Sequence, residues 1–326
     1  MKPLRLGLIG TGIAAERLYL PRLQKLRGHL RLEACANRTR SKAVAFAKLA
    51  KVPLVFDTAE ALLACPDLDA VLISLPIELQ PAMVLKALRA GKHVLSEKPV
   101  AGSLAQGRAL LKQAAPFQHR GLRWMVGENF RFWPQGLQLR TWLEQGRLGD
   151  VRLVEVRQLG LTDERVPYFH TAWRTRPKFV GGFVTDAGVH LAHVVRSCFG
   201  LPLEIRRLTA QYNPMLRPLD TVVAALRFPG GILGSWTSCY AAADSGPILT
   251  VRGSKANAVF TWHDSQLQAH GSKPLMGAAG GNGMSRQFKH FAEAVRGSTE
   301  FEVSPAETLA DLAFMQGLVQ GKALRP

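Results

Sequence analysis

Residues Leu4–Ala15 read LRLGLIGTGIAA, an apolar run that passes directly into a turn of the form GxGxxA. The apolar run predicts a short buried strand, and the residues after the turn favour a helix. Gly10 permits the tight turn, Gly12 lets the backbone approach a pyrophosphate, and Ala15 lets the helix pack closely on the strand. Free N–H groups at the start of such a helix can hold phosphate oxygens. The stretch therefore predicts the first strand and helix of a dinucleotide-binding fold.

The residues up to about 122 repeat this alternation of strand and helix. The predicted strands are Leu30–Ala36, Asp69–Pro76 and Lys92–Ser96, and the predicted helices are Ser41–Ala50 and Pro81–Ala90. Strands that alternate with helices form a parallel, doubly wound sheet, and ligands bind at the carboxyl ends of its strands. This half of the chain therefore predicts one crevice, lined by Gly10, Asn37, Pro76 and Lys98.

The residues after the second predicted strand bear on the choice between NAD and NADP. An acid there would hold the ribose hydroxyls of NAD, but this chain has Asn37-Arg38-Thr39-Arg40. Cations and hydroxyls suit a 2′-phosphate, so the sequence favours NADP, with NAD as the alternative. A second interpretation is that these side chains are solvated charges at the start of a helix.

Length and composition favour a two-domain globular protein. The 326 residues exceed the size at which one hydrophobic core usually keeps growing, and a hydrophobic fraction of 47% argues against disorder. We expect a dinucleotide-binding domain over residues 1–122 and a second domain over residues 123–326. The four cysteines form no C-x-x-C pair, and we find neither a signal peptide nor a membrane span. A cytoplasmic location is therefore expected.

The formal net charge of +18 raises nucleic acid, an anionic membrane or a polyanionic ligand as partners. The basic residues are scattered, however, and no run of five or more Lys or Arg marks a nucleic-acid-binding tail. We therefore expect a basic enzyme with a small-molecule substrate, and neither a membrane nor a nucleic-acid partner.

Glu97-Lys98-Pro99 follows the last predicted strand of the first domain. Because proline disfavours helical geometry for the residue before it, Lys98 should lie in extended backbone at the strand end. An ordinary surface loop is the alternative interpretation of such a short triplet.

The second half of the sequence has a different pattern. After a predicted helix at Gln135–Gln145, strand-like segments follow at Val151–Arg157, Ile205–Tyr212, Thr221–Phe228, Ile232–Tyr240 and Ile248–Phe260. Their order predicts an α+β domain with a large, mostly antiparallel open sheet. The segment Gly271–Gly283 is rich in small residues and predicts a loop, either a linker or a substrate lid.

Gly181–His193 is the segment of this half that carries chemistry. If it is helical, Asp186, His190 and His193 lie on one stripe, where a carboxylate and an imidazole can orient each other. A helix cap with core histidines is the alternative. A metal site that adds Cys198 is not expected, because no set of ligands with suitable spacing completes the shell.

These motifs together resemble the Gfo/Idh/MocA oxidoreductase family, which is named for glucose–fructose oxidoreductase and inositol dehydrogenase. The matching stretches are the GxGxxA turn, Leu75-Pro76, Ala90–Val94, Glu97-Lys98-Pro99, Trp124–Phe132, Trp173-Arg174 and the G-G-x-x-x-D-x-G-x-H signature at Gly181–His190. The chain departs from the family at Ile77 and Gln80, where an Asn and a His are common, and at His193, where an acid is common.

The resemblance implies a Rossmann domain, NADP or NAD as cofactor, a homo-oligomer (dimer or tetramer), and a catalytic set of Lys98, Asp186 and His190. It places cofactor contacts at Gly10, Gly12, Ile13, Asn37, Arg38, Arg40, Leu75, Pro76, Gln80, Glu97, Lys98 and Asn129. Substrate contacts fall on Lys98, Arg131, Asp186 and His190.

The sequence thus predicts a nicotinamide-dependent oxidoreductase that acts on a hydroxyl or carbonyl of a sugar, cyclitol or related polyol. His190 is the preferred base, and Lys98, which hydrogen-bonds the same reacting oxygen, is the alternative proton acceptor. Asp186 orients His190 and holds an adjacent substrate hydroxyl. Two alternatives stay open: an NADP(H)-sensing regulator or scaffold without turnover, and an oxidoreductase on a dihydrodiol or an imine.

Overall fold

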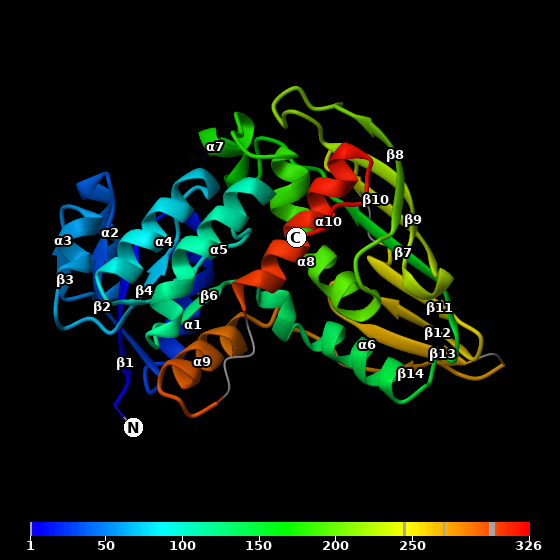
Figure 1. Cartoon of the computed structure of the whole chain (residues 1–326), viewed down its shortest axis with the longest axis horizontal. Coiled ribbons are helices and arrows are strands. Elements are labelled where there is room, and N and C mark those ends of the chain that lie inside the picture. The colour runs from blue at the N-terminus through cyan, green and yellow to red at the C-terminus, as the bar shows by residue number, and fades with distance from the viewer. Residues whose placement is uncertain (1, 244–245, 270, 300–303) are drawn as a thin grey trace. The chain divides into compact units, whose positions relative to one another are not determined.

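The computed structural model describes residues 2–243, 246–269, 271–299 and 304–326, and the chain forms two compact units (Figure 1). The first unit comprises Met1–Glu128 and Met284–Leu309, and the second comprises Asn129–Gly283 and Ala310–Pro326. These bounds differ from the predicted division after residue 122, for two reasons. The residues just beyond 122 form the last strand of the first sheet, and a later segment returns to the first unit.

The first unit contains a six-stranded sheet in the order β3-β2-β1-β4-β5-β6, with every neighbouring pair parallel. Its strands are β1 Leu4–Ile9, β2 Leu30–Ala36, β3 Leu54–Phe56, β4 Ala70–Ile73, β5 His93–Ser96 and β6 Trp124–Val126. The central strand β4 is buried throughout, as expected where both faces of a parallel sheet are covered. The predicted doubly wound sheet is confirmed.

The helices of this unit cover the sheet. They are a π-helical turn at Ala15–Tyr19 that leads into α1 Leu20–Lys25, then α2 Arg40–Ala50, α3 Ala59–Leu63, α4 Gln80–Arg89, α5 Leu104–His119 and α9 Met284–Val295. The two helices predicted after the second and third predicted strands are confirmed as α2 and α4. The sequence reading did not identify β3 and α3, and both are short. The late helix α9 packs beside α1, and Arg296 donates hydrogen bonds to the carbonyl oxygens of Lys2 and His29.

The second unit contains an eight-stranded sheet in the order β14-β13-β12-β11-β7-β10-β9-β8. Its strands are β7 Val151–Leu159, β8 Glu204–Ala210, β9 Thr221–Arg227, β10 Leu233–Cys239, β11 Leu249–Gly253, β12 Ala256–Phe260, β13 Ser265–Ala269 and β14 Leu275–Met276. Only β7 and β10 pair in parallel among these strands, so the predicted, mostly antiparallel sheet is confirmed. The segment Gly271–Gly283 is not entirely loop, because it contributes β14.

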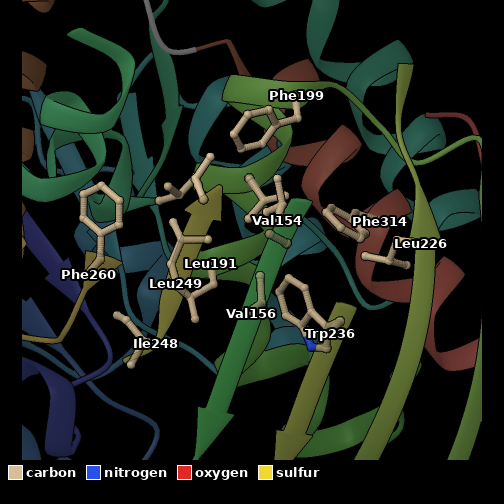
Figure 2. Packing of buried hydrophobic residues seen from close by; sticks show 14 of the residues in the cluster. Val154, Val156, Leu191, Phe199, Leu226, Trp236, Ile248, Leu249, Phe260 and Phe314 are labelled. Atoms are coloured by element: carbon tan, nitrogen blue, oxygen red, sulfur yellow. The ribbon is translucent and has the colours of Figure 1, made fainter. Parts of the chain in front are cut away.

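One face of this sheet packs against helices and forms the core of the second unit (Figure 2). The helices that pack on this face are α6 Pro134–Glu144, α8 Gly182–Phe199 and α10 Pro305–Gln320, whereas α7 Ala172–Thr175 contacts α8. Val154 and Val156 on β7 and Trp236 on β10 project toward Leu191 of α8 and Phe314 of α10. The rings of Trp236 and Phe314 meet edge to face at 5.4 Å between centroids.

The opposite face of the sheet carries exposed apolar side chains among polar ones. Leu208 on β8 is 78% exposed and stands opposite Val223 on β9, which is also exposed. Leu233 on β10 is exposed as well. Apolar side chains of this size, gathered on one open sheet face, are typical of a surface that another protein covers.

A buried charged cluster joins α8 to α10. Asp311 is fully buried, Arg196 donates from Nε to its Oδ1, and Nδ1 of His193 lies 2.9 Å from its Oδ2. His193 was predicted to share a stripe with Asp186 and His190, and all three do lie on α8. The hydrogen bond that the structure describes for His193, however, joins it to Asp311 on α10. Among the described residues, no helix is long and apolar enough to cross a membrane.

We predict that Asp311→Ala lowers the midpoint of urea unfolding strongly, because it leaves the charge of Arg196 buried without its carboxylate. Breaking such a buried pair costs about 3–5 kcal/mol. Circular dichroism during a urea titration measures the effect. Asp150→Ala removes an exposed carboxylate in the same unit and serves as control. Equal midpoints for the two variants would show that the cluster does not support the fold.

Candidate active site

The turn after β1 is shaped by two glycines with different surroundings. Gly10 has a φ of +97°, and a Cβ there would lie 2.1 Å from the carbonyl oxygen of Ser74. Its N–H donates to the carbonyl oxygen of Ala36, so the turn is tied to the end of β2. Gly12 is exposed, and a Cβ there would meet no atom within 4 Å. The turn therefore leaves open space at Gly12, and Ile13 begins the helix beyond it.

Asn37 lies directly after β2, at the position where the sequence lacked an acid. Its Nδ2 donates to Oγ1 of the buried Thr11 at 2.8 Å, and its Oδ1 accepts from the N–H of Thr39 at 3.0 Å. The Asn37 amide thus connects the glycine turn to the start of α2. Asn37 was predicted as a cofactor contact. The two hydrogen bonds that the structure describes for its side chain hold the loop between β2 and α2 in place.

Arg38 and Arg40 are both exposed beside this loop. Arg40, the first residue of α2, forms an ion pair with Asp57, which directly follows β3. The sequence reading did not identify Asp57, because it did not mark β3 as a strand. The predicted cation group is therefore present, but one of its members already has a carboxylate beside it.

The end of β4 leads into a second group of predicted cofactor contacts. Leu75 and Pro76 are half-buried, and Gln80 begins α4. The Gln80 side chain is fully buried, and neither its amide oxygen nor its amide nitrogen finds a hydrogen-bond partner among the described residues. A buried amide without partners is uncommon in folded proteins, and it is a candidate for a ligand or water contact.

Glu97 and Lys98 follow β5, as predicted, and Lys98 is half-buried. The hydroxyl of Tyr19 donates to Oε1 of Glu97, and the Lys98 N–H donates to its Oε2 at 3.2 Å. Tyr19 is itself buried against Phe288 of α9, with ring centroids 5.8 Å apart. These contacts hold the backbone of Glu97 and Lys98, so the Lys98 side chain extends from a fixed position at the end of β5.

The first unit fits a dinucleotide on the evidence of its own geometry. The glycine turn leaves room for a phosphate at Gly12, and the helix that follows offers backbone N–H groups. Gly10, Asn37, Pro76 and Lys98 all lie at the carboxyl ends of parallel strands, as predicted for a crevice at one edge.

In the second unit, Asp186 is buried on α8 and forms an ion pair with Arg174. Nε of Arg174 donates to Oδ2 of Asp186 at 2.7 Å, and its Nη1 donates to Thr171. The guanidinium carbon lies 3.8 Å from the ring centroid of Trp173 and 4.7 Å from that of Tyr168. Arg174 is therefore held by cation–π contacts while it fixes one oxygen of Asp186.

His190 lies one turn after Asp186 on α8 and is half-buried. Its ring stacks on Phe130, with centroids 4.7 Å apart and an interplanar angle of 25°. Phe130 belongs to a 3₁₀ turn at Asn129–Phe132 that also contains the half-buried Arg131. Asn129 is buried, and its Nδ2 donates to the carbonyl oxygen of Asn282. Its described hydrogen bond is thus within the second unit.

Close packing brings α8 to its position. A Cβ at Gly188 would lie 2.3 Å from Cε of Met315 on α10, so a larger residue at this position, between Asp186 and His190, would require the end of the Met315 side chain to shift. Tyr240, just after β10, is buried below the same helix. Burial raises the pKa of Tyr240, and the negative charge of Asp186 raises it further, so the phenol stays protonated near neutral pH.

Two residues near Asp186 were not assigned to the site from the sequence. Arg174 had been matched to the family without an assigned role, and its pairing with Asp186 required knowledge of the fold. Tyr240 carried no signal in the sequence. The three predicted catalytic residues belong to different units: Lys98 to the first, Asp186 and His190 to the second. Their meeting in one pocket stays a prediction.

Within the part of the chain that the structure describes, no group of three or more His, Cys, Asp or Glu is arranged to hold a metal ion. His193, the residue that suggested one, contacts Asp311. Burial raises the pKa of Cys198 to about 11, so this thiol is protonated near neutral pH.

Comparison with known proteins agrees with this geometry. The model of an oxidoreductase family with an NAD-binding Rossmann fold matches residues 4–127, and the GFO/IDH/MocA C-terminal domain matches residues 137–259. A trans-1,2-dihydrobenzene-1,2-diol dehydrogenase from Bos taurus is 31% identical over 328 residues, which cover 95% of this chain and 94% of that protein.

Solved structures give the same result. An oxidoreductase from Thermotoga maritima matches with a TM-score of 0.92 at 31% identity, covering 98% of this chain and 97% of that one. The aldose-aldose oxidoreductase from Caulobacter crescentus shares the fold, with a TM-score of 0.85 at 23% identity and coverage of 98% and 97%. The chain therefore belongs to the Gfo/Idh/MocA oxidoreductase family.

Proposed function

We propose that this oxidoreductase transfers hydride between NADP and a secondary hydroxyl or carbonyl of a sugar, cyclitol or related polyol. The observation that carries the proposal is the arrangement on α8. A half-buried imidazole, His190, lies one turn from a buried carboxylate, Asp186, whose orientation is fixed by Arg174. Such a pair can accept a proton and hold a neighbouring hydroxyl at the same time.

The proposed oxidation removes two hydrogens from the carbinol group, a hydride from its carbon and a proton from its oxygen, and each goes to its own acceptor. The nicotinamide, when bound, supplies the acceptor for the hydride that leaves the carbinol carbon. His190 takes the hydroxyl proton, and the Lys98 ammonium donates a hydrogen bond to the oxygen as it becomes a carbonyl oxygen. In the reductive direction, His190 returns the proton to that oxygen. The Tyr19 and Glu97 contacts position the backbone from which Lys98 extends.

Asp186 is proposed to orient His190 and to accept a hydrogen bond from an adjacent substrate hydroxyl. One of its oxygens is held by Arg174, whose own position is fixed by Trp173 and Tyr168. A carboxylate has about four acceptor sites on its two oxygens, so the same group can accept from Arg174 and from a substrate hydroxyl. Arg131 and Lys98 complete the proposed substrate contacts.

A specific observation also favours a cyclic dihydrodiol as substrate. His190 stacks on Phe130, and Phe130 in turn contacts Trp133 at 5.0 Å and Trp262 at 6.2 Å between centroids. Of these three rings, Phe130 and Trp133 are buried, and Trp262, which is exposed, offers flat apolar surface to an unsaturated ring. The bovine relative is named for such a diol. A sugar also presents an apolar face, so this class is a second candidate.

NADP is the proposed cofactor because Arg38 and Arg40 lie exposed at the end of β2, where an acid would favour NAD. NAD is the alternative. The proposed contacts are the residues predicted from the sequence, with Asn37 acting through the loop and Gln80 through its buried amide.

We further propose that a second copy of the chain covers the open sheet face of the second unit, forming a dimer or a tetramer. The exposed Leu208, Val223 and Leu233 support this proposal. A cytoplasmic location is proposed because Cys35, Cys65, Cys198 and Cys239 are all free thiols, as is usual in a reducing compartment.

Gly12→Ala is expected to leave the thermal midpoint unchanged and to weaken NADP binding about tenfold, or ~1.4 kcal/mol, because the added methyl fills space needed by the phosphates. Gly10→Ala instead forces a Cβ against Ser74 and should lower the midpoint. Isothermal titration and differential scanning calorimetry separate the two effects. Unchanged NADP affinity in Gly12→Ala would contradict the proposed phosphate position.

Lys98→Met and His190→Ala should each lower kcat about a hundredfold or more, since each removes a group that acts on the reacting oxygen. The assay is a screen of sugars, cyclitols and a cyclic dihydrodiol with NADP and NAD, followed by reduced-nicotinamide absorbance. Lys112→Met and His119→Ala on the exposed face and end of α5 are controls. Full turnover in both test variants would refute the assignment. Cofactor binding without turnover of any substrate would favour a sensor.

Sedimentation velocity at micromolar concentration should show an oligomer, and Leu208→Glu should shift it toward the monomer by placing a charge on the covered face. Leu49→Glu, on the exposed face of α2, is the matched control and should leave the sedimentation coefficient unchanged. A monomeric parent protein at this concentration would exclude the proposed interface.

A further inference from the structure

Asp57 and the cation group lie side by side at one edge of the first sheet. In the parallel pairing of β2 and β3, Ala36 stands opposite Phe56. The next residues along the two strands are therefore Asn37 and Asp57, which leave the sheet at the same edge. Arg40 reaches from the start of α2 to Asp57 and forms an ion pair with its Oδ1.

The ion pair between Arg40 and Asp57 contributes little to stability. The two side chains are 62% and 68% exposed, so water and salt screen their attraction. Such a pair is readily separated when a stronger partner for either side chain arrives. Its importance therefore lies in what else each member can bind.

The start of α2 is locally short of negative charge. No acid lies in its first turn, Thr39 makes no side-chain cap, and Arg38, Arg40 and Lys42 surround a helix end that is itself partially positive. Asn37 brings no charge, and its amide already holds Thr11 and Thr39. Asp57 is the carboxylate that the structure pairs with this group.

We propose that Asp57 sets the preference between NADP and NAD by competing with the 2′-phosphate for Arg40. The inference rests on the proposed function, in which Arg38 and Arg40 receive that phosphate. To pair with Arg40, the phosphate has to displace the carboxylate, and the two anions then repel each other at short range. The 2′-hydroxyl of NAD brings no charge, so it meets neither cost. Asp57 thus lowers affinity for NADP and leaves affinity for NAD almost unaffected.

Two nucleotide fragments that differ only by the 2′-phosphate test this role without catalysis. These are adenosine 2′,5′-bisphosphate and adenosine 5′-monophosphate, titrated calorimetrically into the full chain. Asp57→Asn should tighten binding of the bisphosphate about threefold to tenfold at low salt, as expected for removing one nearby negative charge. Binding of the monophosphate should change less than about twofold, and the gain should shrink at high salt.

Asp67→Asn is the matched control. Asp67 is an exposed acid of the same unit that pairs with Arg5 before β4, so its replacement changes the net charge equally at another place. It should leave the ratio of the two affinities unchanged. Asp57→Asn introduced into Arg40→Gln should increase bisphosphate affinity less than Asp57→Asn introduced into the parent protein does. The reason is that Arg40, the group for which carboxylate and phosphate compete, is missing.

The outcomes separate this role from the proposed function. An unchanged ratio in Asp57→Asn, in a parent protein that binds NAD and NADP, would overturn the role of Asp57 alone. Weaker monophosphate binding in that variant would also overturn it, since it would show that the carboxylate holds the ribose. A parent protein that binds neither dinucleotide would contradict both proposals.

Discussion

The close approach of Gly10 to Ser74 is the contact on which the first unit depends. With φ at +97° and a missing Cβ, Gly10 lets the end of β1 press against the chain that leaves β4, while its N–H is bound to the end of β2. Three strand ends are thereby fixed to one another at the switch point of the sheet. Every group proposed to touch the cofactor in this unit is placed relative to that junction.

The second unit depends in a similar way on α8. Its apolar stripe packs on the sheet while its polar positions divide between two tasks: Asp186 pairs with Arg174, and His193 lies against Asp311. Each of these two carboxylates, Asp186 and Asp311, pairs with an arginine, since Arg196 completes the second cluster. The buried acids on α8 and against it are thus paired with arginines. Such pairing offsets part of the free-energy cost of burying a charge.

Local pattern was sufficient to predict β1, β2, α2 and α4, because apolar runs and helical spacing act over a few residues. It also placed Asp186 and His190 on one stripe on the condition that their segment is helical, and α8 meets that condition. It could not predict partners distant in sequence, such as Tyr19 for Glu97 or Asp311 for His193, because chain folding alone brings them together. Short elements without a strong pattern, above all β3, were missed, and Asp57 was missed with it.

The net charge of +18 gains a physical meaning from this arrangement. Some cations are consumed in pairs with acids, as Arg174 and Arg196 are, but the arginines beside β2 lie at the surface of the proposed cofactor crevice. A cofactor that carries several phosphate charges is attracted by a positive protein field over a longer range than any one contact. A carboxylate such as Asp57 acts against that field at one point, next to Arg40. The positive field of the protein then favours binding of both NAD and NADP. The single ion pair of Arg40 and Asp57 decides between these two cofactors, which differ by one phosphate.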